Sequence, residues 1–418
     1  MSGPITLFDK SFLQSLSVDE SMWFDNFFRA NICPLFYVET LADLEKRVRE
    51  GRNAEQEVGV IAAKFPEMYG SPNAYHGILA IGDLTGKPVA MTGQIMLASG
   101  RLAKTATNVM AIVEQSPEAD AFARWQRCEF QEIERRYARA WREGLSSLDL
   151  DQVAKNLRAQ GIDRTSCKEL ADAKRLAESL FSSSNKSSDL ELALQLLGVP
   201  LQLRKSAMKR WKRSGCPSLN NHAPYAAYVL TVQLFFQIAL AANLISTGRS
   251  SNFVDIAYLF YLPFCQIFVS SDRLHRNCAP LFLRKEQEFV WGEELKGGLT
   301  ELNQFYEAFR DEIEKKGVMG FAVYPPEDRD FFVTQLWDRH CWKWRERKEG
   351  NKDRTAEELA YVDSYMKTKM KEALQAPPVP ADAVDFEANN PEFMLQHLVK
   401  RRKGSWWQVS KNLKFPKT

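Results

Sequence analysis

Short apolar runs, each followed by an acidic residue, recur along the chain. They are 4–8 before Asp9, 34–38 before Glu39, and 265–269 before Asp272. Runs of this length between turn-forming residues are typical of buried strands. The apolar spacing between them predicts helices over 11–16, 22–30 and 41–50. Strands that alternate with helices predict an α/β fold built on a parallel sheet.

The same pattern returns in the second half of the chain. Asp255 opens a short apolar helix that ends near Pro263, and the strand over 265–269 follows. One more strand is expected at 289–291, before a helix over 300–313 with an apolar stripe. The sheet is therefore predicted to consist of two sets of strands that are far apart in the sequence.

The chain between these two sets has a different composition. Residues 114–213 are rich in Ala, Glu, Arg, Leu and Lys, which favours helices. We interpret this stretch as a helical insertion in the α/β domain. The predicted organisation is a first half at 1–113, the insertion at 114–220, a second half at 221–320, and a basic, Trp-rich extension at 321–418.

The stretch 225–245 is almost entirely apolar and approaches the length that spans a bilayer. Two glutamines and an asparagine interrupt it, and such groups are costly at mid-membrane. We expect a buried core helix, and a membrane-associated protein is the alternative.

Composition and cysteine usage narrow the class of protein. The chain has 418 residues, a net charge of +3 and seven cysteines. The cysteines form no CxxC pair, which argues against a disulfide framework and a structural zinc site. Because the N-terminal residues show no secretory pattern, we expect a cytoplasmic protein. The net charge alone does not argue for nucleic acid.

Carboxylates at the carboxyl ends of neighbouring parallel strands can meet at one sheet edge. Candidates at such positions are Asp9, Glu39, Asp43, Asp255 and Asp272. Oxygen ligands of this kind suit Mg²⁺ or Mn²⁺, which can activate water for phosphodiester hydrolysis. Each acid also has a local explanation as a turn residue, a helix cap or a partner of the helix dipole. Their joint placement favours a metal site.

The ordered set resembles the PIN-domain superfamily of metal-dependent ribonucleases, in a larger PIN-like branch. Ile5-Thr-Leu-Phe-Asp9 resembles the first strand and its aspartate, and Val38-Glu-Thr-Leu-Ala-Asp-Leu44 the segment with the second acid. The stretch from Asp255 to Asp272 resembles the third acid and the Ser/Thr-x-Asp element. The resemblance covers about 4–50 and 222–295.

This resemblance implies a three-layer fold with a central, mostly parallel sheet, a helical insertion and a basic C-terminal extension. It implies a nuclease in which Asp9, Asp255 and Asp272 bind Mg²⁺ or Mn²⁺, with RNA expected over DNA. The second acid is expected to be Asp43, which matches the family's Thr-Leu-Ala-acid-Leu pattern, with Glu39 as the alternative; Asp9, Asp43, Asp255 and Asp272 are the expected catalytic residues. A toxin or defence role, with a protein inhibitor or homo-oligomer, fits the family. The alternative is an inactive PIN-like scaffold or nucleic-acid-binding module.

Several polar and aromatic residues are candidates for contact with single-stranded or structured RNA. Cations follow phosphates and aromatic rings stack on bases. His275, three residues after Asp272, either faces the site or is structural. The predicted substrate contacts are Ser270, Ser271, Arg273, Arg276, Lys400, Arg401, Arg402, Lys403, Trp406 and Trp407. The basic segments 205–213 and 337–348 have the same character.

Overall fold

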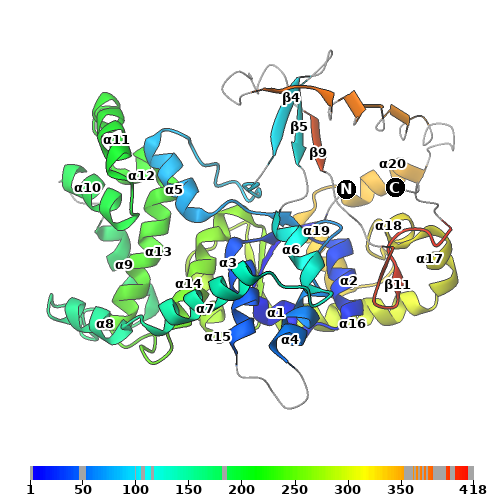
Figure 1. Ribbon diagram of the computed structural model, residues 1–418, viewed down its shortest axis with the longest axis horizontal. Helices are drawn as coiled ribbons and strands as arrows, with labels where there is room; N and C mark the ends of the chain where they lie inside the picture. Colours follow the sequence, from blue (N-terminus) through cyan, green and yellow to red (C-terminus); the bar gives the residue numbers. More distant parts are fainter. Residues whose placement is uncertain are drawn as a thin grey trace.

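The computed structural model (Figure 1) describes residues 3–46, 53–98, 100–104, 109–113, 117–180, 186–352, 375–379, 392–395 and 401–412, with a few separate positions between 361 and 372. Its centre is a five-stranded sheet in which every strand pair is parallel. The strands are β1 (Ile5–Phe8), β2 (Arg29–Ile32), β3 (Ser71–Pro72), β6 (Ile267–Ser270) and β7 (Glu288–Trp291). The predicted α/β class is confirmed.

The strand order in this sheet is β3-β2-β1-β6-β7. The two halves of the sequence therefore meet where β1 pairs with β6, in a register that places Phe8 opposite Val269. Both strands are fully buried, as expected for strands covered on both faces. The long insertion leaves the sheet and returns to it, so β1 and β6 are neighbours despite about 260 intervening residues.

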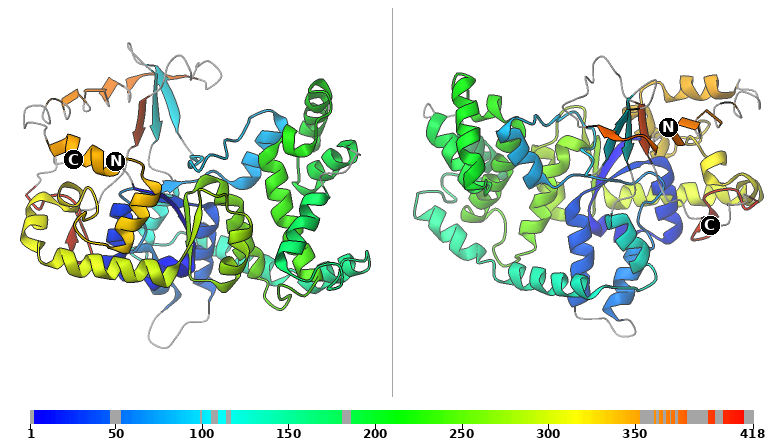
Figure 2. Two further views of the ribbon diagram at one scale, coloured as in Figure 1. Left: turned by 180° about the vertical axis from the view of Figure 1, so that it is seen from behind. Right: turned by 45° about the horizontal axis from the view of Figure 1, so that its top comes forward.

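Helices follow the strands on both sides of the sheet in Figures 1 and 2. Those from the first part of the chain are α1 (Lys10–Ser15), α2 (Val18–Phe27), α3 (Pro34–Leu41), η1 (Ala42–Glu45), α4 (Ala54–Ala62), α5 (His76–Thr85) and α6 (Pro117–Trp125). Those after the insertion are α14 (Asn252–Ala257), η2 (Tyr258–Phe264), α15 (Arg273–Cys278), η3 (Ala279–Leu281), α16 (Gly292–Glu307), α17 (Arg310–Lys316), α18 (Val318–Phe321), α19 (Phe332–His340) and α20 (Trp344–Lys352).

Two predicted elements near Glu39 are wrong. The run 34–38 is not a strand but most of helix α3, and the strand is the preceding β2. Pro34 occupies the first helical turn, where its missing N–H costs nothing. The predicted helix at 41–50 is also wrong as far as the structure describes it, to residue 46, because α3 ends at Leu41 and a short 3₁₀ turn follows it. A short apolar run is compatible with a buried helix as well as a strand.

The insertion is helical, as its composition predicts. Within 114–220 it begins with α6 and continues with α7 (Glu132–Ser146), α8 (Leu150–Arg158), α9 (Leu170–Ser179), α10 (Lys186–Leu196), α11 (Leu201–Arg213) and the start of α12 (Leu219–His222). Helix α13 (Pro224–Ala241) follows directly after these bounds. From α8 onward these helices form a lobe beside the sheet in Figure 1, and α13 packs against α8, α9 and α5. The helical packing thus continues past residue 220.

Helix α13 is the described helix that is long and apolar enough to cross a membrane, yet 67% of its 18 residues are buried inside the protein. This is the packing expected of the predicted core helix. Its Tyr225 and Tyr228 hydroxyls donate to the backbone oxygens of Phe260 and Leu259, which connects the lobe to the segment before β6.

A second sheet joins the first quarter of the chain to its C-terminal part. Its strand order is β8-β4-β5-β9, with β4 (Arg101–Lys104), β5 (Val109–Val113), β8 (Pro378–Val379) and β9 (Glu392–Leu395). The chain then forms an antiparallel hairpin of β10 (Arg402–Lys403) and β11 (Trp406–Trp407), which contacts α2 and α17. The hairpin part of the predicted extension is therefore packed against the folded body.

Candidate functional site

The strand order of the central sheet reverses direction between β1 and β6. In open parallel sheets the connections leave such a point in opposite directions, and a crevice forms at the carboxyl ends of the two strands. Asp9 follows β1 directly, and Asp272 lies two residues after β6. Two of the predicted acids are therefore brought to the same sheet edge.

Asp9 is buried and held in one orientation by several donors. It caps α1, where its Oδ1 accepts from the backbone N–H of Phe12 at 2.9 Å. Its Oδ2 accepts from the hydroxyls of Ser11 at 2.6 Å and Ser270 at 2.8 Å. Burial opposes ionisation, but His275 and these donors outweigh it and hold the pKa of Asp9 below its usual value. Asp9 is therefore a fixed anion.

His275 lies behind this carboxylate and is completely buried. Its Nδ1 is 2.8 Å from Ser270 Oγ and 3.4 Å from Asp9 Oδ2, and its Nε2 is 2.6 Å from the backbone oxygen of Asp255. Burial alone would lower the pKa of His275. The acceptor and charge of Asp9, with the charge and carbonyl of Asp255, raise it to about 9. The imidazole is thus a resident cation in the acidic cluster.

Asp255 and Glu39 complete the cluster from two further helices. Burial raises the pKa of Asp255 to about 7, and repulsion from Glu39, Asp272 and Asp9 adds to the effect while His275 opposes it. Burial also raises the pKa of Glu39, although Lys10 and the Tyr258 hydroxyl favour its anion. That hydroxyl donates a hydrogen bond to Glu39 Oε2. Four carboxylates from four segments thus influence one another.

Asp43 has a different environment. Its Oδ1 lies 3.0 Å from Lys10 Nζ, 2.6 Å from Lys46 Nζ and 3.7 Å from the Arg142 guanidinium. Because α3 gives way to the 3₁₀ turn, Asp43 lies among these cations, and its charge is not among those that shift the pKa of Asp9 or Asp255. Of the two alternatives for the second acid, the structure brings Glu39 to the cluster.

The cluster contains oxygen donors of the type that Mg²⁺ and Mn²⁺ prefer. Within the described residues, however, no three His, Cys, Asp or Glu side chains are gathered so that they could hold one ion as they stand. Asp9 is engaged by His275 and two hydroxyls, and Asp272 accepts from the backbone N–H of Leu274 at 2.6 Å. The donor chemistry fits a hard cation, and a shared ion would have to replace some of these hydrogen bonds.

The other residues predicted beside Asp272 differ in their surroundings. Among the described residues, the buried Ser271 Oγ has no hydrogen-bond partner. Gly292 leaves room for it, since a Cβ there would lie 2.1 Å from this oxygen. Arg273 is exposed at the start of α15. Arg276 stacks over the Trp291 ring at 5.0 Å. Ser271 Oγ is thus packed against Gly292 at the start of α16.

The predicted basic tail is divided by the hairpin. Lys400 lies outside the described residues, while Arg401 and Arg402 are exposed and Trp407 is half-buried. Lys403 and Trp406 are buried, so in this conformation they pack within the protein and do not present themselves to RNA.

Sequence reasoning did not single out the residues that position the acids. Lys10, Ser11 and Tyr258 contact Asp43, Asp9 and Glu39 respectively. The adjacent sequence Asp-Lys-Ser, typical of a helix N-terminus with a short-range Asp–Ser contact, is a usable signal for Ser11. Nothing in the pattern indicates that Tyr258 and Glu39 meet, because they are far apart along the chain.

Fold and site together define an α/β protein with an acidic cluster at the point where the order of a parallel sheet reverses. Comparisons with protein-family models, with curated proteins and with solved structures find no match for this chain. Its function is therefore argued from the geometry of the cluster.

Proposed function

We propose that this protein is a metal-dependent endonuclease of PIN-like, three-layer fold that hydrolyses phosphodiester bonds, with RNA as the expected substrate. The observation that supports this most is the placement of Asp9 and Asp272 after the adjacent strands β1 and β6, where their charges and that of Glu39 act on Asp255. Ligands bind at this edge of open parallel sheets. The order of the acids along the chain agrees with the resemblance to PIN-like ribonucleases.

The electrostatics of the cluster also favour a cation. Carboxylates that repel one another are costly to bury unless a positive charge neutralises them. Burial is the main cause that raises the pKa of Asp255 to about 7, and repulsion from Glu39, Asp272 and Asp9 adds to it while His275 opposes it. The pKa of Glu39 also stays raised despite Lys10, so these two cations compensate the buried carboxylates only in part.

Asp9, Glu39, Asp255 and Asp272 are the residues that would hold Mg²⁺ or Mn²⁺. Such an ion supplies a water of lowered pKa and charge stabilisation at the leaving oxygen. The protein's own groups orient the site: Ser11 and Ser270 hold Asp9 Oδ2, and the Tyr258 hydroxyl holds Glu39 Oε2. With a pKa of about 7, Asp255 is partly protonated at neutral pH, and a cation bound beside it would favour the ionised form.

A second candidate is a PIN-like scaffold that binds nucleic acid without cleaving it. His275 favours this alternative, because its charge lies against Asp9 and compensates part of the cluster without metal. The present arrangement of side chains, in which no three described groups surround a common point, also agrees with it.

The test is to measure Mn²⁺ binding by calorimetry and metal-dependent cleavage of a labelled RNA, for the natural protein and for Asp9→Asn and Asp255→Asn. We expect micromolar to millimolar Mn²⁺ binding and cleavage in the natural protein, with both lost in the two variants. Loss of cleavage should come without loss of secondary structure by circular dichroism. Binding of RNA without Mn²⁺ binding or cleavage would establish the scaffold instead.

A further inference from the structure

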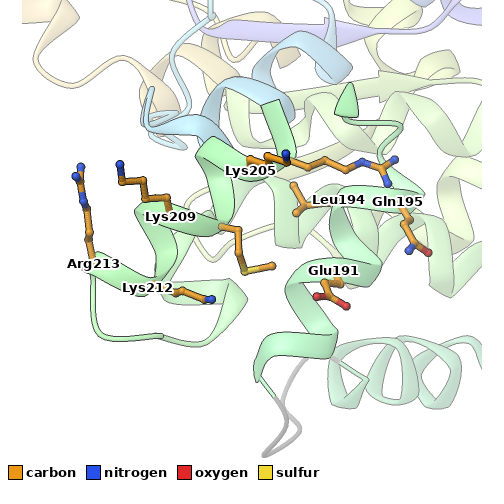
Figure 3. Close-up of a pocket in the computed structure, with 9 residues that line it drawn as sticks. Glu191, Leu194, Gln195, Lys205, Lys209, Lys212 and Arg213 are labelled. Carbon is orange, nitrogen blue, oxygen red and sulfur yellow. The ribbon is translucent and has the colours of Figure 1, made fainter. Parts of the chain in front are cut away.

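A groove with strongly basic walls lies between α10 and α11 at the outer part of the helical lobe. It has a volume of about 800 Å³ and is lined by Glu191, Leu194, Gln195, Arg204, Lys205, Met208, Lys209, Lys212 and Arg213. Figure 3 shows the long basic side chains of α11 extending from one wall and Glu191 on the other. Five cations and one carboxylate thus border one cavity.

Packing explains why these cations face the groove. The buried face of α11 carries Ala207 and Trp211, and the Trp211 indole N–H donates to the backbone oxygen of Pro217 at 2.8 Å. Arg210 points the other way and donates to the backbone oxygen of Asp83 at 3.1 Å. Lys205, Lys209 and Lys212, at spacings of four and three residues, share the remaining exposed face.

This charge distribution does not stabilise the fold. Helix α11 contains no acidic residue, and like charges three or four residues apart on a helix repel. No described acidic side chain forms an ion pair with Lys205, Lys209 or Lys212. A concave surface lined by unpaired cations concentrates an anionic ligand.

We propose that this groove is a docking site for the phosphate backbone of single-stranded nucleic acid, outside the acidic cluster. The spacing of the lysines suits a series of phosphates, and charge complementarity identifies the ligand. None of the described residues that line the groove is aromatic, and the Trp211 ring of α11 is buried. These residues offer cations for phosphates but no ring for base stacking, so we expect binding to be independent of sequence.

The inference extends the proposed function, because its ligand belongs to the proposed substrate class. The groove is on the lobe, whereas the acids lie at the sheet edge between α1, α3 and α15 (Figure 1). The groove would therefore hold a nucleic acid at a distance from the cleavage point. It does not require that the protein cleaves what it binds.

The test compares two triple variants of the full chain with equal charge change. One is Lys205→Gln/Lys209→Gln/Lys212→Gln in the groove. The other is Lys168→Gln/Lys285→Gln/Lys315→Gln, three exposed lysines from separate segments. Binding of a labelled 20-nucleotide RNA of mixed sequence is measured by fluorescence anisotropy between 50 and 200 mM salt, without divalent metal.

Each phosphate contact of a single strand contributes about 0.7 to the slope of log affinity against log salt. Loss of three contacts should reduce the steepness of that slope by about 2. Between 50 and 200 mM salt, the affinity of the natural protein should therefore fall roughly twenty-fold more than that of the groove variant. The scattered variant should retain the natural slope. The scattered variant should unfold at the natural temperature, because its replaced side chains are exposed. The groove variant should unfold at the same temperature or slightly above it, because it also loses the repulsion between its lysines.

Equal slopes for the two variants, or no RNA binding by the natural protein, would overturn the proposal. Polyglutamate that binds the groove more tightly than RNA would also overturn it, and would favour an acidic protein partner that covers the exposed Leu196 and Leu201 nearby. An Asp255→Asn protein that binds RNA with the natural slope while no form of the protein cleaves would leave the groove standing and reject the nuclease.

Discussion

Replacement of the buried Trp406 should lower the free energy of unfolding far more than replacement of its neighbour Trp407. The Trp406 side chain is 1% exposed, whereas that of Trp407 is half-buried. Both belong to the basic tail, and the sequence predicts both as RNA contacts. The comparison therefore asks whether the hairpin is part of the folded body or an appended arm.

The contacts of Trp406 determine the magnitude. Its ring packs edge-on against Trp23 at 5.0 Å between centroids, and the Arg310 guanidinium lies 4.8 Å from its centre. Its indole N–H donates to Asn303 Oδ1 at 2.8 Å. Removal of a buried Trp side chain costs about 3–5 kcal/mol, including the cavity left behind. Asn303 stays satisfied because Trp23 also donates to it at 2.9 Å, so no orphaned acceptor adds to this cost.

The measurement is urea unfolding followed by far-UV circular dichroism for the natural protein, Trp406→Ala and Trp407→Ala. We expect Trp406→Ala to lower the free energy of unfolding by about 3 kcal/mol or more. Trp407→Ala should lower it by less than about 1 kcal/mol, because that ring is half-buried and its neighbouring cations, Arg401, Arg402 and Lys411, are all exposed. Similar small losses in both variants would refute the docking of the hairpin.

Two further predictions concern the acidic cluster and pH. Glu39→Gln should reduce metal-dependent cleavage by at least about 10- to 100-fold, the loss seen when even an outer-shell partner of a metal ligand is changed. Asp43→Asn should retain cleavage and lower stability, because it weakens the ion pairs to Lys10 and Lys46. Cleavage rates and thermal unfolding check this, and the reverse pattern would make Asp43 the second acid. Burial lowers the pKa of His76 from 6.5 to about 4. As the pH falls, the unfolded chain therefore binds a proton at this residue before the folded protein does. Stability should fall between about pH 6.5 and 4, by at most about 3 kcal/mol. His76→Phe should remove this part of the pH dependence of unfolding, and an unchanged slope would contradict the assignment.

Much of the fold follows from patterns that are local in the sequence. The apolar run before Asp9 and the run that ends before Ser270 are strands where they were predicted, because short buried runs between turn residues leave few other solutions. The composition of the insertion was sufficient to predict helices there. The acids Asp9, Asp255 and Asp272 could be singled out because each lies beside such an element.

Other features depend on contacts between distant segments. Glu39 and Asp43 are four residues apart and chemically similar, and only the end of α3 and the position of Lys10 separate their environments. Likewise, the alternation of charge and tryptophan in the tail is compatible with a free arm and with a hairpin. Only the tertiary structure shows that Lys403 is buried and donates to the backbone oxygen of Phe65. The periodicity of apolar residues indicates which positions are buried. The residue that a buried side chain contacts depends on how distant segments pack, which local pattern does not contain.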